Sequence, residues 1–264
     1  MEKQIIGRGI LAGALAGVLA FLWARVLIEP VIDRAIGFED GVGEAHEAMA
    51  HAHGGHSHGD GGEVFTRGIQ SNIGMGFGVL IFSVAMGALF AVVFCVVYNK
   101  TTISARALSV LTAGGMLVSL WIVPALKYPP NPPAVSLDET IQQRTLLYLL
   151  MVVLSAALFV GAVYLGHRLK RNLGAWNATL AATGAYIVAV AVVMLILPTI
   201  DETPGPLRDD SGAIVFAGFP ADDLYQFRLL SLGTQVVMWA TIGLVFAALV
   251  SRLLDGRRRE QLAA

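Results

Sequence analysis

The sequence predicts an all-α integral membrane protein, a single domain over residues 1–264 that crosses the bilayer with six helices. Two observations lead to this prediction. The chain is 56% hydrophobic and only 14% charged, whereas soluble domains carry about a quarter charged residues. The apolar residues also come in long blocks, and a helix needs roughly 20 such residues to cross about 30 Å of hydrocarbon.

Six blocks have the required length, and no charged residue stands in the middle of any of them. Arg8 and Arg25 are the charged residues that enter a block, and both stand near the ends of the first one. We therefore expect six transmembrane helices, over residues 5–28, 73–98, 107–126, 146–166, 177–199 and 232–250.

Glycine and proline indicate how individual blocks are built. Gly9, Gly13 and Gly17 repeat every four residues in the first block, a spacing that lets a second helix approach closely. We expect tight packing along this stripe, with a functional gate as the alternative. Pro124 interrupts the third block and frees the carbonyl of Leu120, which a neighbouring helix, water or an ion must satisfy.

Charged residues divide unequally between the two sides of the predicted bundle. One side holds both termini and the short connections near 99–106 and 167–174, with eleven Lys or Arg residues and three carboxylates. The other side has seven cations and sixteen carboxylates. Because positive loops stay in the cytoplasm, we expect both termini there. The opposite face is then outside and anionic, which raises the local concentration of cations.

Three long outer loops follow from this topology. Residues 29–68 form a His/Asp/Glu-rich loop, residues 127–145 a proline-rich loop and residues 200–231 an acidic loop. The cytoplasmic connections are too short for a catalytic domain, and the sequence has no Walker-type phosphate-binding loop. We therefore expect neither an enzyme nor a nucleic-acid partner, and the lipid bilayer as the surroundings of the chain.

Five of the six histidines fall within thirteen residues of the first outer loop. Neutral imidazole is a common ligand of Co²⁺, Ni²⁺, Cu²⁺ and Zn²⁺, and the intervening Gly54 and Gly55 allow a sharp reversal. A flexible loop cannot enforce a geometry, so it suits capture of a metal better than selection. A solvated linker without an essential role is the alternative. The candidate ligands are His46, His51, His53, His56, His58, Glu47 and Asp60.

Carboxylates also stand near the outer ends of the predicted spans. As a group they could line a vestibule for a dication, and individually each also suits a hydrated span end or a helix N-terminus. Both interpretations stay open. The carboxylates concerned are Asp33, Asp201, Glu202, Asp222 and Asp223.

Three amides complete the candidate metal path. Asn131 lies in KYPPNPPAV (127–135), whose four prolines cannot continue a helix. This segment predicts either a rigid turn or an entrance lip with Asn131 as an oxygen donor. Asn177 and Gln235 stand within spans, where amides either line a pathway or tie helices together.

Seven short phrases of the sequence together resemble one known family. From its first span to its sixth, the chain resembles the CbtA family, probable cobalt transporter subunits of bacterial membranes. The phrases are EPVIDRAI (29–36), RGIQ (67–70), KYPPNPPAV (127–135), RTLLY (144–148), LGAWNATL (173–180), LPTIDETP (197–204) and GFPADDLYQFRLLSLGTQ (218–235).

The resemblance implies uptake of a divalent metal ion, cobalt before nickel or zinc, across the bacterial inner (cytoplasmic) membrane. It also implies a small single-span partner of the CbtB kind, and a homo-oligomer stays open. A membrane-anchored accessory subunit that binds metal and feeds another permease without conducting is the alternative. We expect no resident cofactor. The driving force would come from a partner or from the membrane potential, worth about 2.3 kcal/mol per charge per 100 mV.

Overall fold

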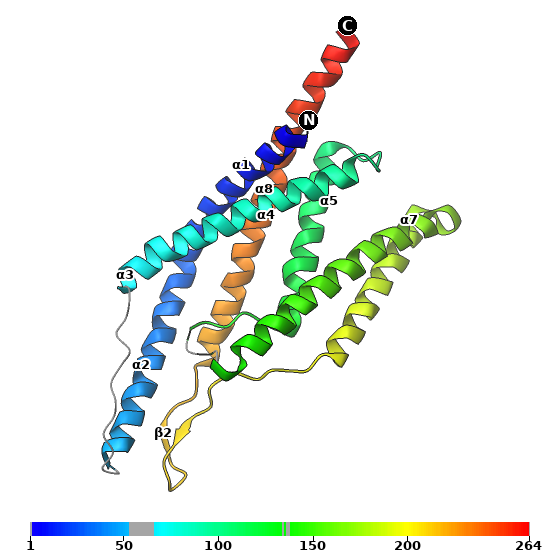
Figure 1. Ribbon diagram of the computed structural model, residues 1–264. Helices are drawn as coiled ribbons and strands as arrows, with labels where there is room; N and C mark the ends of the chain where they lie inside the picture. Colours follow the sequence, from blue (N-terminus) through cyan, green and yellow to red (C-terminus); the bar gives the residue numbers. More distant parts are fainter. Residues whose placement is uncertain (1, 53–65, 134, 136–137, 264) are drawn as a thin grey trace.

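The computed structural model describes residues 2–52, 66–133, 135 and 138–263, and most of these are helical (Figure 1). Two short antiparallel strands, β1 and β2, form a hairpin. In chain order the elements are α1 (Glu2–Trp23), the π-helical η1 (Ala24–Ile28), α2 (Glu29–Ala52), α3 (Arg67–Ile69), η2 (Gln70–Gly74), α4 (Met75–Tyr98), α5 (Ala105–Leu117), η3 (Val118–Ile122), α6 (Val123–Lys127), α7 (Asp138–Ile196), β1 (Leu207–Arg208), β2 (Ile214–Phe216) and α8 (Ala221–Ala263).

Five helical stretches in the described part of the chain are long and apolar enough to cross a membrane by length and composition. Every predicted apolar block falls within one of them or overlaps it. The predicted class, an all-α protein built from helices of membrane length, is therefore confirmed. The stretches are Glu2–His51, Arg67–Tyr98, Ala105–Lys127, Glu139–Ile196 and Ala221–Leu254.

The longest helix, α7, contains two of the predicted blocks. Its 59 residues would far exceed the thickness of a bilayer if they formed one straight rod. Gly174 interrupts the helix with φ 74° and ψ 170°, a backbone conformation that glycine adopts without strain. Figure 1 shows that α7 turns back on itself, so blocks 146–166 and 177–199 lie on separate legs. The count of six crossings stays a prediction.

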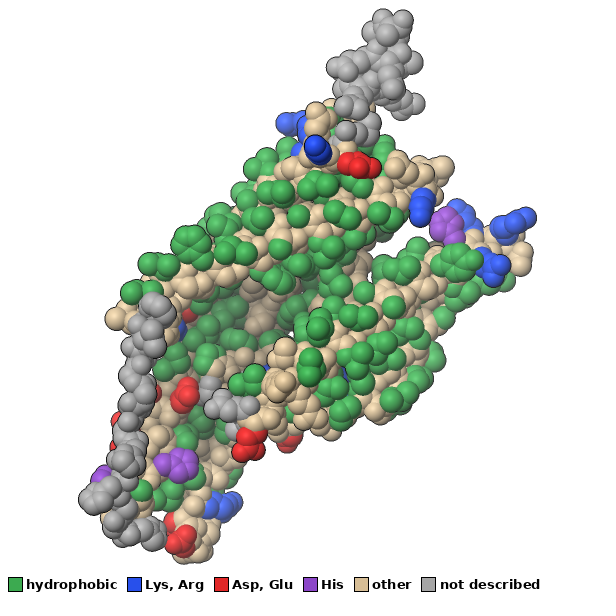
Figure 2. All heavy atoms as spheres, in the orientation of Figure 1, with side chains coloured by type: hydrophobic (Ala, Val, Ile, Leu, Met, Phe, Trp, Pro, Cys, Tyr) green, Lys and Arg blue, Asp and Glu red, His purple; other side chains and the backbone are tan. Residues whose placement is uncertain are grey.

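The molecule has two ends of opposite charge. The N-terminus of α1 and the C-terminal part of α8 lie at one end in Figure 1, with the α4–α5 connection and the turn of α7 on the same side. Most of the Lys and Arg side chains visible in Figure 2 gather there, and we name it the basic end. The acidic end comprises the end of α2, the segments 127–133 and 197–221, and the β1–β2 hairpin, where Asp, Glu and His gather.

Glycines hold α1 and α4 in close contact, as the stripe in the first block predicted. A Cβ atom on Gly13 would lie 3.0 Å from the Cα of Val84 and 3.1 Å from the Cα of Gly87, and one on Gly9 would collide with the carbonyl oxygen of Gly87. Only hydrogen fits between these backbones. The residues around this seam include the largest buried side chains of the main core, among them Phe90, Phe94, Trp239 and Phe246, contributed by α4 and α8.

The third block contains a local widening next to its proline. The π-helical turn η3 spans Val118–Ile122 and passes directly into α6, where Pro124 occupies the first turn. Because η3 and α6 form one continuous helix, Pro124 lies inside it and leaves a carbonyl of the preceding turn without its usual backbone donor. The buried Ser119 hydroxyl donates to the carbonyl of Gly115 at 2.7 Å, and it satisfies one more polar group in this region.

Residues 29–52 correct the expected flexible loop. They form α2, which continues α1 through η1 as helix and extends beyond the predicted span. The stretch EAHEAMAHA (44–52) is rich in alanine and glutamate, which are strong helix formers. The apolar block ends at Ile28, so hydropathy alone did not reveal that the helix continues.

A small second core supports α2 beyond the predicted span. Phe38 makes edge-to-face contacts with Phe216 and Phe219, at ring-centroid distances of 5.5 and 5.0 Å. Ala35, Val135 and Phe219 are buried around it. The hairpin and the proline-rich segment therefore pack against α2, and this contact stabilises the acidic end as a folded structure.

Candidate functional site

Two of the five clustered histidines lie within the described residues, together with Glu47. His46, Glu47 and His51 are all exposed on α2, whereas His53, His56, His58 and Asp60 lie outside the described residues. Five helical residues turn through about 140° beyond a full turn, so His46 and His51 point to different sides of α2. They cannot bind one ion together while α2 is helical. Glu47 and His51, four residues apart, share a face.

The ring of His46 is held in one tautomer. Its Nδ1 lies 3.0 Å from the carbonyl oxygen of Val42, and because a carbonyl only accepts, Nδ1 must carry the hydrogen. Nε2 is then the nitrogen with a lone pair for a metal ion. This arrangement resembles the backbone contact that commonly orients a metal-binding imidazole, and it is compatible with the predicted role of His46.

Glu202 is the most buried of the five predicted vestibule acids. Its side chain is 2% exposed, and Oε2 lies 2.8 Å from Nη1 of Arg144. Oε2 also accepts from Nδ2 of Asn131 at 3.1 Å, while Oε1 accepts from the hydroxyl of Thr140 at 2.6 Å. Both carboxylate oxygens therefore have partners from the segments around 127–144. In this structure Glu202 ties the acidic segment to the proline-rich segment.

Asn131 is committed to the same network. Its Oδ1, the predicted oxygen donor for a metal, accepts from Nη2 of Arg228 at 2.9 Å. Nε of Arg228 donates to the carbonyl of Pro130 at 3.4 Å, and Arg144 donates to the carbonyl of Pro129. Two arginines thus cap carbonyls that no helix uses. The proline-rich segment has the form of a rigid turn, and the role of Asn131 as a metal ligand stays a prediction.

The remaining acids divide between ion pairs and exposed positions. Asp223 lies 2.6 Å from Nε of Arg34, and Asp33 lies 3.0 Å from Nη2 of Arg67. Asp201 is exposed and accepts from the backbone amide of Thr203 at 3.3 Å.

The predicted vestibule is therefore not assembled as a ring of acids facing one ion. Asp222 is exposed in the first turn of α8. Among the residues that the structure describes, no three His, Cys, Asp or Glu side chains are grouped so that they could hold a metal ion.

The two amides expected within the spans lie apart from this end. Asn177 is exposed on α7, three residues after the break at Gly174 on the basic side of the molecule. Gln235 is half-buried on α8. Their roles as pathway residues stay predictions.

Sequence reasoning missed the arginines that organise the acidic end. Arg34, Arg67, Arg144 and Arg228 bind carboxylates, amides or free carbonyls there. A signal was present, because each of them stands inside one of the phrases that carry the family resemblance: EPVIDRAI, RGIQ, RTLLY and GFPADDLYQFRLLSLGTQ. The net negative charge of this face did not indicate that many of its acids have arginine partners in the same phrases.

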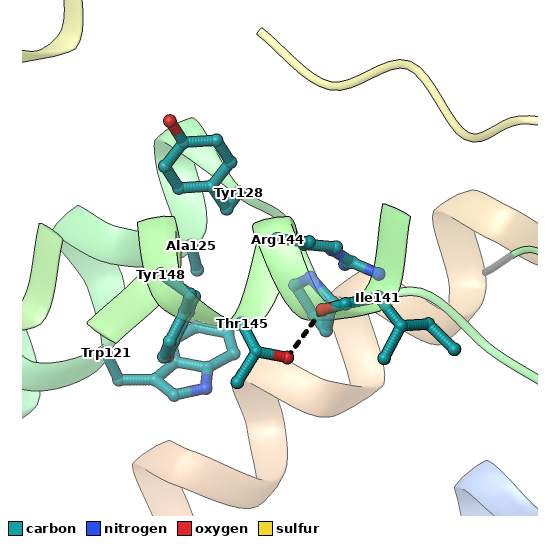
Figure 3. A pocket seen from close by; sticks show the side chains of 8 residues that line it. Trp121, Ala125, Tyr128, Ile141, Arg144, Thr145 and Tyr148 are labelled. Carbon is teal, nitrogen blue, oxygen red and sulfur yellow. Dashed lines mark hydrogen bonds between the residues drawn. The ribbon is translucent and has the colours of Figure 1, made fainter. Parts of the chain in front are cut away.

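A pocket of about 410 Å³ lies beside the Glu202 network, between α6 and the start of α7 (Figure 3). Aromatic and apolar side chains dominate its wall, and Arg144 supplies a positive charge. Tyr128 donates from its hydroxyl to the carbonyl of Pro198 at 2.8 Å, and burial raises the pKa of this phenol. A pocket with a guanidinium and neutral phenols does not suit a dication. Its lining is Trp121, Ala125, Tyr128, Pro130, Ile141, Arg144, Thr145 and Tyr148.

The apolar helices of membrane length, with a basic end and an acidic end, define a helical membrane protein rather than a soluble one. The chain belongs to the CbtA family: the family model described as "Probable cobalt transporter subunit (CbtA)" matches residues 2–251, nearly the whole chain. No curated protein and no solved structure matched the chain.

Proposed function

We propose that this chain is the membrane subunit of a cobalt uptake system of the bacterial inner membrane, and that its histidine-rich segment captures the divalent ion outside. Family membership supports cobalt as the substrate and a role as a subunit. The observation that carries the direction of transport is the separation of charge between the two ends of the bundle (Figure 2). A dication is attracted to the acidic end, where histidines and carboxylates offer ligands.

The proposed topology has six crossings, with the basic end and both termini in the cytoplasm. An even number of crossings brings the two termini to one side, as in Figure 1. The break at Gly174 supports two crossings within α7, since either leg exceeds the roughly 20 residues that a bilayer requires. Lys and Arg at the basic end agree with the tendency of positive loops to stay in the cytoplasm.

The membrane potential is the proposed driving force. A dication that moves toward a negative cytoplasm gains about 4.6 kcal/mol per 100 mV, twice the value for a single charge. The middles of the apolar blocks contain no Asp, Glu or His, so a proton relay through these helices has no carboxylate or imidazole to use.

Cobalt flux into proteoliposomes tests the capture role. We expect radioactive Co²⁺ to enter vesicles that contain the chain and carry an inside-negative potential. Replacing the clustered histidines by glutamine should weaken the apparent affinity and preserve the maximal rate, because a capture site raises local concentration without forming the conduction path. The replaced residues are His46, His51, His53, His56 and His58.

Each alternative has a distinct result in this experiment. Loss of all flux in the histidine variant would contradict capture and indicate that the segment belongs to the conduction path. Flux that persists when the potential is collapsed would contradict the driving force. Binding of Co²⁺ without flux, also after a CbtB-like single-span protein is added, would favour the accessory subunit. Competition by Ni²⁺ or Zn²⁺ would measure selectivity, and a homo-oligomer would be detected by cross-linking in the same vesicles.

Capture should also depend on pH. Imidazole binds a metal through its deprotonated nitrogen, and an unperturbed imidazole titrates near pH 6.5. Lowering the pH therefore adds the competing proton, so the affinity for Co²⁺ should be lower at pH 5.5 than at pH 7.5. Calorimetry on the full chain measures this, and the difference should disappear in the histidine-to-glutamine variant. Equal affinities at both pH values would refute capture by imidazole.

A further inference from the structure

Two carboxylates of α2 bind a single arginine. The carboxylates precede the histidine-rich segment in the chain, and the arginine follows it. Glu29 and Asp33 stand four residues apart, so their side chains lie one above the other on the same face of α2. Nη2 of Arg67 lies 2.5 Å from Oε1 of Glu29 and 3.0 Å from Oδ1 of Asp33. α2 and α3, the elements on either side of residues 53–65, therefore meet at this group.

The contact leaves buried polar atoms without hydrogen-bond partners. The side chain of Glu29 is 4% exposed, and its Oε2 is buried without a partner, as is Nε of Arg67. A side-by-side pair of two parallel hydrogen bonds would satisfy both atoms. Here one nitrogen serves two carboxylates instead. A buried carboxylate oxygen without a partner costs free energy, so Glu29 retains the capacity to bind a further ligand.

The charge of the group matches a divalent cation better than a guanidinium, and its dimensions come close to those of a cation site. Two carboxylates opposite one guanidinium leave one negative charge, whereas a dication would neutralise both. The two contacts with Arg67 place the carboxylate oxygens within 5.5 Å of each other. A first-row dication with oxygen ligands at about 2.0–2.2 Å holds them within about 4.4 Å. Asp33, with 59% of its side chain exposed, has the freedom to make this small adjustment.

The two carboxylates also differ in depth. Asp33 is in contact with water, while Glu29 is buried one turn nearer the end of the first predicted span. An ion released by the histidine-rich segment would meet the exposed carboxylate first and the buried one second. One turn before Glu29, Arg25 donates from Nε to Oδ1 of Asn72 at 2.9 Å, so its guanidinium is engaged by an amide.

We infer that Glu29 and Asp33 form a binding site for the divalent metal ion at the mouth of the first span, and that Arg67 fills this site with its guanidinium until the metal displaces it. The inference rests on the proposed function, because it names the site that receives the captured ion. Arg67 is a tethered competitor: it keeps the buried carboxylate neutralised when no metal is bound, and it leaves when two positive charges arrive.

Calorimetric titration of Co²⁺ into the full chain in lipid nanodiscs tests this site. The five clustered histidines are first replaced by glutamine so that imidazole does not mask it. Glu29→Gln removes a ligand without changing its shape and should weaken Co²⁺ binding roughly tenfold or more. Arg67→Gln removes the competitor and should strengthen binding, by roughly fivefold if the pair has the upper strength of a part-exposed ion pair.

Arg34→Gln is the matched control. It also removes one positive charge, at the α2 position that directly follows Asp33, but Arg34 pairs with Asp223 and Gln226 rather than with Glu29. Its Co²⁺ affinity should therefore stay unchanged. An equal gain in Arg34→Gln and Arg67→Gln would reduce the effect to general electrostatics and overturn the site.

An ordinary structural ion pair gives the opposite pattern. In that case Glu29→Gln and Arg67→Gln would both lower the melting temperature and leave the affinity for Co²⁺ unchanged, which overturns the inference. If Glu29→Gln does not fold, the Co²⁺ affinity of Arg67→Gln tests the site by itself: stronger binding supports it, and unchanged or weaker binding overturns it. Vesicle flux is measured separately. If the chain transports Co²⁺ but Glu29→Gln and Arg67→Gln leave its Co²⁺ affinity unchanged, only this site is rejected. If both variants change the affinity as expected but no Co²⁺ flux is observed, only the transport function is rejected.

Discussion

Gly87→Ala is expected to destabilise the bundle by about 1–3 kcal/mol or more, the range for overpacking a close-packed interior. A Cβ atom at this position would collide with the carbonyl oxygen of Gly9 and lie 2.8 Å from the Cα and 2.9 Å from the nitrogen of Gly13. These atoms belong to the backbone of α1, so no side chain can rotate away. The helices must separate, and the contacts along the whole seam weaken. Unfolding in mixed micelles of mild detergent and dodecyl sulfate measures the loss.

Gly78→Ala provides the matched control on the same helix. A Cβ atom there has no neighbour within 4 Å, and alanine is the better helix former by up to about 1 kcal/mol. This variant should be as stable as the parent chain or slightly more stable. Similar destabilisation of both variants would show that glycine matters for the flexibility of α4 and not for its approach to α1.

Glu202→Gln is expected to destabilise the acidic end by about 3 kcal/mol, because removing one partner of a buried ion pair leaves the other charge uncompensated. The glutamine keeps the shape of the side chain but cannot neutralise Arg144, whose side chain is only 18% exposed. Arg228 adds a second guanidinium to the network through Asn131. Loss of the single carboxylate therefore leaves two positive charges together. Thermal unfolding in nanodiscs, followed by helical circular dichroism, measures the effect.

Asp201→Asn is the control for the neighbouring position. Asp201 is exposed and makes a contact with the backbone of Thr203, so its substitution should change stability by no more than about 0.5 kcal/mol. The double variant Glu202→Gln with Arg144→Gln should recover part of the loss, since it removes both charges of the pair. If the loss of stability in the double variant equals the sum of the losses in the two single variants, Glu202 and Arg144 do not act as a pair.

The fold was largely predictable because membrane helices follow from composition. The apolar length of the blocks and the glycine spacing at 9, 13 and 17 are local properties, and the structure has the corresponding helices and seam. Two features escaped this reasoning. The helix continues through Glu29–Ala52, where hydropathy falls but helix formers persist. The two legs of α7 are joined with only Gly174 as a break, so the connection predicted near 167–174 is almost entirely helical.

The candidate site was predictable in its residue types and not in its pairings. The sequence placed histidines, acids and Asn131 at the end opposite the basic residues, and Figure 2 shows acids and histidine there. It did not indicate that Asn131 and Glu202 bind each other, or that Asp33 and Glu29 share Arg67. These partners are between 34 and 71 residues apart in the chain, and no periodicity connects them.

The sequence by itself determined that this chain enters a membrane and which end carries each charge, because the transfer free energy of a helix depends on what it contains and not on its neighbours. Only the tertiary structure decided which acids are neutralised and which retain the capacity to bind a cation. That decision depends on which helices pack side by side, since a carboxylate is paired when an arginine from another element comes within hydrogen-bonding distance. Glu202 has such partners for both of its oxygens, whereas Glu29 has one for a single oxygen.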